Sequence, residues 1–489
     1  MSTTVSKAQT VATQARHDAA SSFYHLAHTP LQGKACQGLA CFVARHENPA
    51  RWEQACAQKE RLYCLGKCYT GPAATSDKSR PRIAVHSKQP VVLERIVAGG
   101  ARTLQAYGGY KALERVRSQP PEETIKLLEA ANLRGRGGAG FPAGRKWRAV
   151  FSQPAGQKYV IANADEGDPA AYIDRFIIED DPHVMIEAMA IAGHAVGASK
   201  GYIYLRKEYP NAIRILGKAL AEAHAAGYLS EKFGLELFEG HGAYICGEET
   251  ALLNSIEGKR PEVRARPPYP TEKGLWDKPT IVNNVETFAN IPWIVNHGAD
   301  AYRALGFSKS QGTKAVSLNS LFKRPGLYEV DFGCTVRYIV EELGGGLKDG
   351  TLKGLIIGGP LAGILPPNLL DTNFGFEELR AVGAMVGHGG ILAFDEHTSI
   401  AELVNHVFSF GAYESCGKCT PCREGGLRVE QIFARAMREG RAATAERKEC
   451  DEINAALLAT SLCGLGTGMG EFMQSAVRYY GKELEASFA

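Results

Sequence analysis

Apolar residues recur at helical spacing in the last part of the chain. After Ser399 they fall on one helix face, at Ile400, Leu403, Val404, Val407 and Phe408. Ser399 and Glu402 are spaced as a capping-box pair, which marks the start of a helix. Gly411 is expected to end this helix. From about residue 400 onward, the chain therefore predicts a helical bundle.

Between residues 90 and 310, short apolar runs alternate with helical stretches. Strands are predicted at 159–162, 202–205 and 244–246, and a helix at 212–225. This alternation predicts a Rossmann-like α/β domain, in which helices flank a layered sheet. From about residue 314 the pattern changes to strands at 315–318, 327–330 and 352–357 with one helix at 336–343. That order predicts a small β-grasp (ubiquitin-like) domain.

We therefore expect an α/β multidomain protein. In chain order the expected parts are a disordered terminus at 1–20, a cysteine-bearing segment at 21–72, a linker at 73–90, an α/β domain at 91–313, a β-grasp domain at 314–398 and a helical domain at 399–489. The linker prediction rests on the proline, serine and small residues that dominate the stretch from 71 to 81.

Composition narrows the function classes. With 45% hydrophobic and 22% charged residues, the chain has the make-up of a soluble globular protein. A net charge of +3 is too small to indicate a nucleic acid or a membrane surface as partner. No apolar run is long enough to span a bilayer, since Glu187 and His194 interrupt the nearest candidate, at 185–198.

The cysteines and the N-terminus bear on location. Twelve cysteines in short-spaced groups favour metal ligation in a reducing compartment over a disulfide framework, so a cytoplasmic protein is expected. The first seventeen residues contain Lys7, Arg16 and His17 and no acidic residue, which weakly suggests a transit peptide. An ordinary disordered terminus is the preferred interpretation.

A cysteine loop gives the most specific chemical signal. Cys416, Cys419 and Cys422 stand at C-x2-C-x2-C spacing, and Cys463 follows downstream. Three thiolates on one loop with a remote fourth are typical of a [4Fe-4S] cluster. Zinc is the alternative, but structural zinc sites usually contain a second knuckle or histidines.

A glycine-rich loop indicates a phosphate site. Gly135, Gly137 and Gly140 match G-x-G-x-x-G, but the preceding residues 124–131 predict a helix where a dinucleotide fingerprint requires a strand. The glycines would still let backbone N–H groups approach a phosphate, and nearby charge would neutralise it, from Arg136, Arg145 and Lys146. The alternative is a plain connector whose basic residues are solvated.

Polar residues cluster after the predicted strands. An amide and three carboxylates follow the strand at 159–162, in the run Asn163-Ala-Asp-Glu-Gly-Asp-Pro169. Glu248 and Glu249 precede a predicted helix, and Asn283 and Asn284 form an adjacent pair of amides. Ligands of open α/β sheets bind at the carboxyl ends of strands, so a flavin and nucleotide site is predicted. A solvated acidic turn would look the same for any one cluster.

Together these motifs resemble the flavin-binding, NADH-oxidising subunit family shared by respiratory complex I, NAD-reducing hydrogenases and NAD-dependent formate dehydrogenases. The resemblance covers roughly residues 90–489. It implies FMN between the α/β domain and the helical cluster domain, with NAD(H) stacked over the flavin.

The resemblance assigns site residues one by one. FMN-binding positions correspond to Gly135, Arg136, Gly137, Gly138, Gly140, Lys146, Asn163, Asp165, Tyr244, Gly247, Glu248, Asn283 and Asn284. NAD(H)-binding positions correspond to Phe141, Asp168, Glu249 and Tyr269, and the [4Fe-4S] ligands to Cys416, Cys419, Cys422 and Cys463. At Asp168, complex I relatives usually have a longer acid, and at Tyr269 a phenylalanine. These two differences favour a relative other than complex I.

Four further cysteines stand near the N-terminus. Cys36 and Cys41 give C-x4-C, and Cys64 and Cys68 give C-x3-C, which resembles the thioredoxin-like [2Fe-2S] subunit that partners this family. The gap between the pairs is shorter than in that subunit, so strands of its domain are expected to be missing. A [2Fe-2S] cluster, a cluster-free thioredoxin-like remnant and zinc all remain open. The lone cysteines, Cys56, Cys246, Cys334 and Cys450, are expected to be small buried apolar residues.

The expected function is electron exchange. The chain would be the diaphorase subunit of an NAD-dependent formate dehydrogenase, in which FMN exchanges hydride with NAD(H) and single electrons with the [4Fe-4S] cluster. The flavin would carry the chemistry, with no protein nucleophile. Expected partners are a molybdenum- or tungsten-containing catalytic subunit and a small [2Fe-2S] subunit. The alternatives are a hydrogenase diaphorase, the flavin subunit of complex I and, from a different class, a zinc-stapled scaffold.

Overall fold

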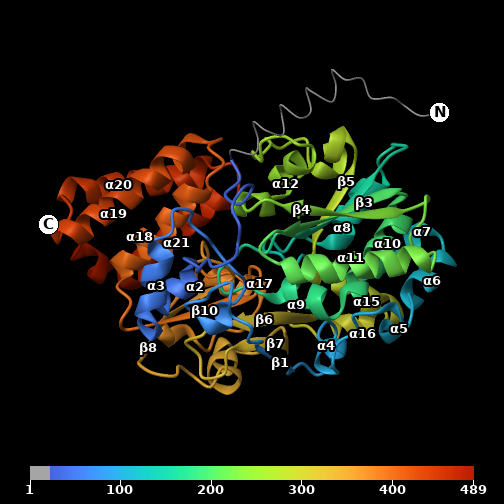
Figure 1. Cartoon of the computed structure of the whole chain (residues 1–489), viewed down its shortest axis with the longest axis horizontal. Coiled ribbons are helices and arrows are strands. Elements are labelled where there is room, and N and C mark those ends of the chain that lie inside the picture. Colours follow the sequence, from blue (N-terminus) through green and yellow to red (C-terminus); the bar gives the residue numbers. More distant parts are fainter. Residues whose placement is uncertain (1–22, 489) are drawn as a thin grey trace.

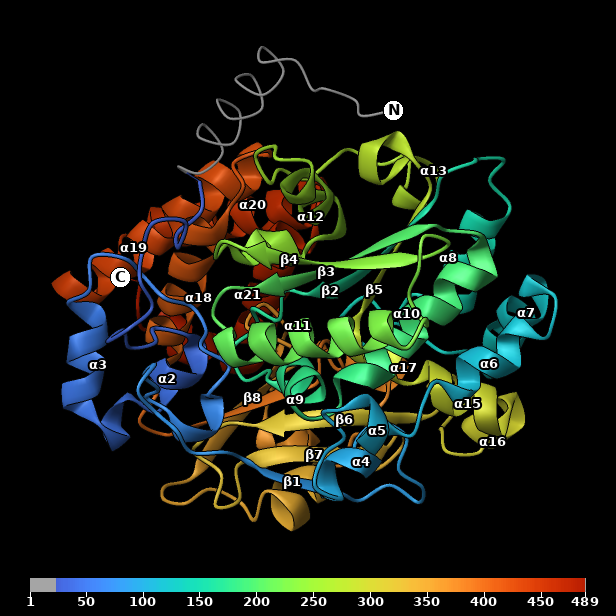
Figure 2. The same cartoon turned by 45° about the vertical axis from the view of Figure 1, so that its right-hand side comes forward.

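The computed structural model describes residues 23–488, so the predicted disordered terminus at 1–20 lies outside the described residues. Figure 1 shows three neighbouring bodies: an α/β body around β2–β5, a second sheet around β6–β8, and the orange to red C-terminal helices. The blue N-terminal helices α2 and α3 lie between the second sheet and the C-terminal helices, as Figure 2 also shows. Within the described residues, no helix combines the length and apolar character needed to cross a membrane.

The α/β body is built on a parallel four-stranded sheet. Its order is β4-β3-β2-β5, with β2 at Tyr159–Ala164, β3 at Lys200–Arg206, β4 at Gly234–Gly240 and β5 at Thr280–Asn284. The apolar helix α10 (Pro182–Val196) is buried almost all round, whereas the amphipathic α11 (Pro210–Ala225) buries one face. The predicted strands at 159–162 and 202–205 and the helix at 212–225 are confirmed.

One strand prediction in this body is wrong. Residues 244–246 belong to a 3-10 turn, η3 (Tyr244–Gly247), and the edge strand is β4 instead. Gly242 has a φ of +76°, so the chain turns out of the sheet directly after β4. The short apolar run that follows therefore does not extend the sheet.

Short helices surround this sheet and lead into the site. They are α4 (Glu94–Val97), α5 (Leu104–Tyr107), α6 (Lys111–Arg117), α7 (Pro121–Ala131), α8 (Ala143–Phe151), α9 (Ile173–Asp180), α12 (Glu249–Ile256), α13 (Pro270–Lys273), α14 (Val285–Ala289), α15 (Ile291–His297) and α16 (Ala299–Arg303). The glycine-rich loop lies between α7 and α8, which confirms that a helix and not a strand precedes it.

The second sheet is mixed and six-stranded. Its order is β1-β7-β6-β10-β8-β9, with β6 at Thr313–Leu318, β7 at Gly326–Asp331, β8 at Leu352–Ile357, β9 at Ile364–Leu365 and β10 at Gly390–Asp395. The three predicted strands are confirmed, and the predicted helix appears as a π-helical turn at Tyr338–Leu343, with α17 (Phe376–Ala381) later in the domain. Strand β1 (Arg82–Val85), which pairs in parallel with β7, lies inside the predicted linker.

The C-terminal part consists of α18 (Ile400–Glu414), α19 (Gly426–Glu439), α20 (Thr444–Thr460) and α21 (Gly464–Glu485). The Ser399–Glu402 capping box is confirmed. The prediction that Gly411 ends α18 is wrong, because the helix continues to Glu414. A Cβ at residue 411 would lie 2.2 Å from the sulfur of Met469, so glycine allows close packing against α21 there.

The N-terminal segment has little regular structure. It contains α2 (Leu39–Val43) and α3 (Pro49–Cys56), and Asn48 caps α3 by accepting a hydrogen bond from the backbone N–H of Arg51. Residues 23–72 include no β-strand, and an isolated bridge joins Ala35 to Ala74. This agrees with the expectation that strands of a full thioredoxin-like domain are missing.

Candidate functional site

A cavity of about 720 Å³ opens at the carboxyl ends of the parallel strands. It brings together nearly all the residues that the sequence assigned to FMN and NAD(H): Gly135, Gly137, Gly138, Gly140, Phe141, Lys146, Asn163, Asp165, Asp168, Tyr244, Gly247, Glu248, Glu249, Tyr269, Asn283 and Asn284. Arg145 and the two residues after Cys463 also line it. The volume suits a cofactor-sized ligand.

Arg136 is the exception among the predicted cofactor residues. Its side chain is fully buried and turns away from the cavity, where it donates hydrogen bonds to the hydroxyl of Tyr302 and the carbonyl of Gln311, each at 2.7 Å. Its backbone N–H donates to the side-chain oxygen of Thr287 at 2.8 Å. The guanidinium therefore holds the glycine loop from the side that faces the protein interior. It does not reach the cavity, where the predicted contact with a phosphate would be.

The glycine loop approaches β5 closely. A Cβ at Gly137 would lie 2.8 Å from the Cβ of Asn284, so a larger residue there would force the loop or β5 to shift. Gly138 and Gly140 have φ angles of +139° and +63°, which side-chain-bearing residues rarely adopt. The ammonium of Lys146 donates to the carbonyl of Val282 at 2.8 Å, which holds a positive charge at the cavity.

Unsatisfied polar atoms line the cavity. Asp165 Oδ2 and Asn283 Nδ2 are buried and have no hydrogen-bond partner among the described residues. Burial raises the pKa of Asp165 well above its usual range. Buried polar groups are normally paired, so a carboxyl oxygen and an amide nitrogen left free beside a cavity fit the polar edge of a bound ring system such as a flavin.

The two aromatic residues of the predicted NAD(H) site are exposed, and its two acids are partly buried. Phe141 and Tyr269 are 49% and 54% exposed. Glu249 forms ion pairs of 3.2 Å with Lys146 and with Arg266. Asp168 accepts a hydrogen bond of 2.6 Å from the Tyr244 hydroxyl.

Glu248 has a structural role as well as a place in the cavity. It caps α12, because its carboxylate accepts from the backbone N–H groups of Thr250 and Ala251, each at 2.9 Å. This cap fixes the turn on which Glu248 and Glu249 stand.

The four predicted [4Fe-4S] ligands come from two elements. Cys416, Cys419 and Cys422 occupy the turn between α18 and α19, and Cys463 is the N-cap of α21. Burial raises the pKa of Cys463 to about 12, with smaller contributions from Glu248, Cys422 and Cys416. Glu248 lines the cavity, and Gly464 and Leu465 do so as well. The cysteine group therefore borders the predicted flavin site.

The N-terminal cysteines converge although the two pairs are far apart in sequence. Cys36, Cys41, Cys64 and Cys68 are all buried, and the sulfurs of Cys64 and Cys68 are 3.2 Å apart. Each sulfur accepts a backbone N–H: Cys36 from Gly38, Cys41 from Ala73, Cys64 from Gly66 and Cys68 from Ala170, at 3.2–3.3 Å. Such hydrogen bonds are typical of sulfurs that ligate iron.

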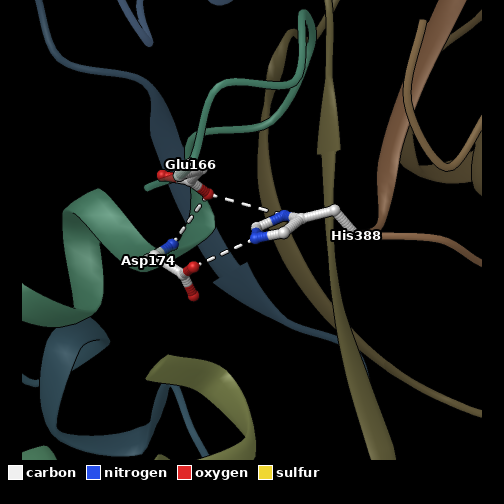
Figure 3. A group of neighbouring side chains, drawn as sticks. All are labelled: Glu166, Asp174 and His388. Carbon is white, nitrogen blue, oxygen red and sulfur yellow. Dashed lines mark hydrogen bonds and ion pairs between the residues drawn. The ribbon is translucent and has the colours of Figure 1, made fainter. Parts of the chain in front are cut away.

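A carboxylate–histidine cluster, consisting of Glu166, Asp174 and His388, also lines the cavity (Figure 3). The sequence marked Glu166 only as one of three acids after a strand, and it offered no reason to connect Asp174 or His388 with the site. His388 lies in a glycine-rich turn before β10, more than 200 residues away. That turn was the one local signal available for it.

The lone cysteines only partly match expectation. Cys246 and Cys450 are buried and Cys334 is half-buried, but Cys56 is exposed, so its prediction is wrong. Cys56 is the last residue of α3, at its solvent-facing end.

Comparison with known proteins gives the same picture. The family model described as the Nuo51 FMN-binding domain matches residues 128–293, and the NADH-ubiquinone oxidoreductase-F iron-sulfur binding region matches residues 402–487. The chain is similar to the NADP-reducing hydrogenase subunit HndC of Solidesulfovibrio fructosivorans, with 41% identity over 85% of each chain. It is also similar to an NADH-quinone oxidoreductase subunit of Rhizobium meliloti (strain 1021), with 39% identity over 81% of this chain and 97% of the relative.

A solved structure extends this similarity to nearly the whole chain. The crystal structure of an NAD+-reducing [NiFe]-hydrogenase in the H2-reduced state matches 97% of this chain and 87% of its own, with a TM-score of 0.83 and 29% identity. The chain therefore belongs to the family of FMN- and [4Fe-4S]-binding, NADH-oxidising subunits that complex I and NAD-reducing hydrogenases share.

Proposed function

We propose that the chain is the diaphorase subunit of a multisubunit hydrogenase, passing electrons between the hydrogenase partner and NAD(H). The observation that supports this choice is the N-terminal four-cysteine site. The hydrogenase structure matches 97% of the chain, a share that must include most of this segment.

The cavity residues divide into two groups in this proposal. The loop at Gly135–Gly140 and Lys146 hold the FMN phosphate, and Asp165, Asn283 and Asn284 hold the polar edge of the ring. Phe141, Tyr269 and Glu249 hold NAD(H) on the open side, with Asp168 beside them. When bound, FMN supplies the exchange between two-electron hydride chemistry and one-electron carriers.

Two groups of cysteines have a connection to this cavity. In this proposal Cys416, Cys419, Cys422 and Cys463 hold a [4Fe-4S] cluster beside the cavity, which is supported by the two cavity-lining residues that directly follow Cys463. In the N-terminal group, Cys68 accepts the backbone N–H of Ala170, two residues after the cavity-lining Asp168. In this proposal, the N-terminal cysteines hold a [2Fe-2S] cluster that gives the partner subunits a second contact with the flavin.

Replacing Cys64 by serine tests the N-terminal cluster. We expect iron and acid-labile sulfide to fall by roughly two atoms each per chain, because one of four ligand sulfurs is lost. The control is Cys56→Ser, since Cys56 lies in the same segment but is exposed and outside the group. Wild-type protein that holds zinc there, or a Cys64→Ser variant with full iron content, would contradict the proposal.

Metal analysis of the native complex, isolated through this chain, tests the proposed partner. We expect nickel together with iron and FMN, because the similar solved structure is that of a [NiFe]-hydrogenase. Molybdenum or tungsten would overturn the hydrogenase assignment in favour of the formate dehydrogenase expected from the sequence. Absence of all three metals would overturn it in favour of a complex I-type subunit.

A further inference from the structure

The side chain of His388 lies between two carboxylates at the cavity. Figure 3 shows its ring directed at Glu166 and Asp174. The Nε2 atom is 3.0 Å from Asp174 Oδ2, and the Nδ1 atom is 3.6 Å from Glu166 Oε1. His388 is 5% exposed, and its Nδ1 has no hydrogen-bond partner among the described residues. Each ring nitrogen of His388 therefore faces one carboxylate.

Both carboxylates are held in place as acceptors. Glu166 accepts the backbone N–H groups at the start of α9, from Ile173, Asp174 and Arg175, at 2.6–3.0 Å. Asp174 accepts from the amide of Asn284 at 2.6 Å and from the backbone of Glu286 at 3.2 Å. These donors favour the ionised form of each carboxylate, but burial and the charge of Asp174 outweigh them at Glu166 and raise its pKa to about 7. Two carboxylates beside one ring favour a proton on each of its nitrogens.

The two carboxylates determine the protonation state of His388. Burial alone would lower its pKa, but the charge and hydrogen bond of Asp174 and the charge of Glu166 outweigh burial and raise the pKa to about 9. Below that pH the ring is an imidazolium. A metal ion could bind these three groups only by displacing the ring proton, so without such an ion the ring carries the positive charge.

A second positive charge near His388, that of Lys314, does not compensate the two carboxylates. Lys314, on β6, donates to the His388 carbonyl at 2.9 Å, but its ammonium is paired with the buried carboxylate of Glu286 on α14. Asp168, also at the cavity, adds a further acid on the same side. Without the imidazolium, the wall of the cavity would contain uncompensated negative charge.

We propose that His388 is a positioning residue that holds a positive charge at the wall of the FMN cavity and raises the reduction potential of the bound flavin. The proposal rests on the proposed function only in that FMN occupies this cavity. Reduction of a flavin bound in the cavity adds negative charge to it. A fixed positive charge in a low-dielectric site stabilises that negative charge. Through Asp174, the same ring also fixes the amide of Asn284, which lines the cavity.

A redox titration of the FMN-loaded full chain tests this inference. We expect His388→Gln to shift the flavin toward its oxidised form about tenfold at pH 7, or about 30 mV for two electrons. His388→Lys keeps a positive charge and should restore part of the shift. His183→Gln is the matched control, since His183 is fully buried on α10 in the same body but lies outside the cavity lining. The reduction potential of the flavin in the His183→Gln variant should equal that in the wild type.

The pH dependence gives a second measurement on the wild-type protein. The folded-state pKa of His388 is raised, so its positive charge is present at neutral pH and is lost as the pH rises through about 9. The wild-type potential should therefore fall more steeply there and approach that of His388→Gln. This measurement remains available if the variant loses FMN.

The outcomes separate the inference from the proposed function. A His388→Gln variant that binds FMN fully with an unchanged potential would overturn the inference alone. A wild-type profile without extra steepness near pH 9 would do the same. Wild-type protein that binds no FMN would overturn the proposed function together with the inference.

Discussion

Replacing Cys419 by serine removes the [4Fe-4S] cluster and leaves the flavin in place. Cys419 supplies one of three thiolates on the turn between α18 and α19, where burial and the neighbouring Cys419 and Cys416 raise the pKa of Cys422 to about 11. Iron binding must stabilise the thiolate forms, so loss of one ligand destabilises the whole cluster. We expect iron and acid-labile sulfide to fall by roughly four atoms each per chain.

The function of the variant separates the two electron steps. NADH should still bleach the flavin absorbance, because the cavity does not include Cys419, whereas reduction of one-electron acceptors through the cluster should stop. Cys450→Ser is the control, since Cys450 is buried in α20 outside the ligand group. Full iron content in the Cys419→Ser protein would show that this cysteine is not a ligand.

Replacing Gly137 by alanine should lower FMN affinity at least tenfold. The added Cβ would lie 2.8 Å from the Cβ of Asn284, closer than side-chain atoms normally approach. Either the loop or β5 must move, and overpacking of this kind typically costs about 1–3 kcal/mol. Both elements line the cavity, so the displacement reaches the phosphate-binding loop and the amide that faces the ring.

Fluorescence titration of the apoprotein with FMN measures this effect. Gly156→Ala is the matched control, because a Cβ at residue 156 meets nothing within 4 Å and the residue lies in the same body. Equal FMN affinity in Gly137→Ala and wild type would show that the loop can relax without cost. It would then argue against a phosphate held by this loop.

Local sequence patterns predicted the parts of the site that depend on neighbouring residues. The cysteine spacing at 416–422 and the glycine loop at 135–140 both lie within single turns of chain, where spacing determines geometry. The capping box at Ser399 was likewise predicted, because its two side chains interact across three residues. Arg136 was misplaced even so, since spacing does not show to which side of a loop a long side chain turns.

The end of helix α18 and the presence of the edge strand β1 depend on tertiary packing. Gly411 stays inside α18 because α21 packs against it, a contact with Met469 that is remote in sequence. Ile83 and Val85 favour a strand, but residues 82–85 form one only by pairing with the edge that β7 offers. Neither feature can be predicted from the local sequence, because each depends on a contact with a distant segment.

The sequence by itself determined the family and most of the residues that line the cavity, and it predicted four [4Fe-4S] ligands, because short motifs fix those chemical groups and their local geometry. Only the tertiary structure decided which distant groups meet. The four N-terminal cysteines converge with Ala170 as a donor, and His388 reaches Glu166 and Asp174 from another domain. Such contacts arise when separate bodies bury their apolar faces against one another, and that packing is not encoded in the spacing of any one segment.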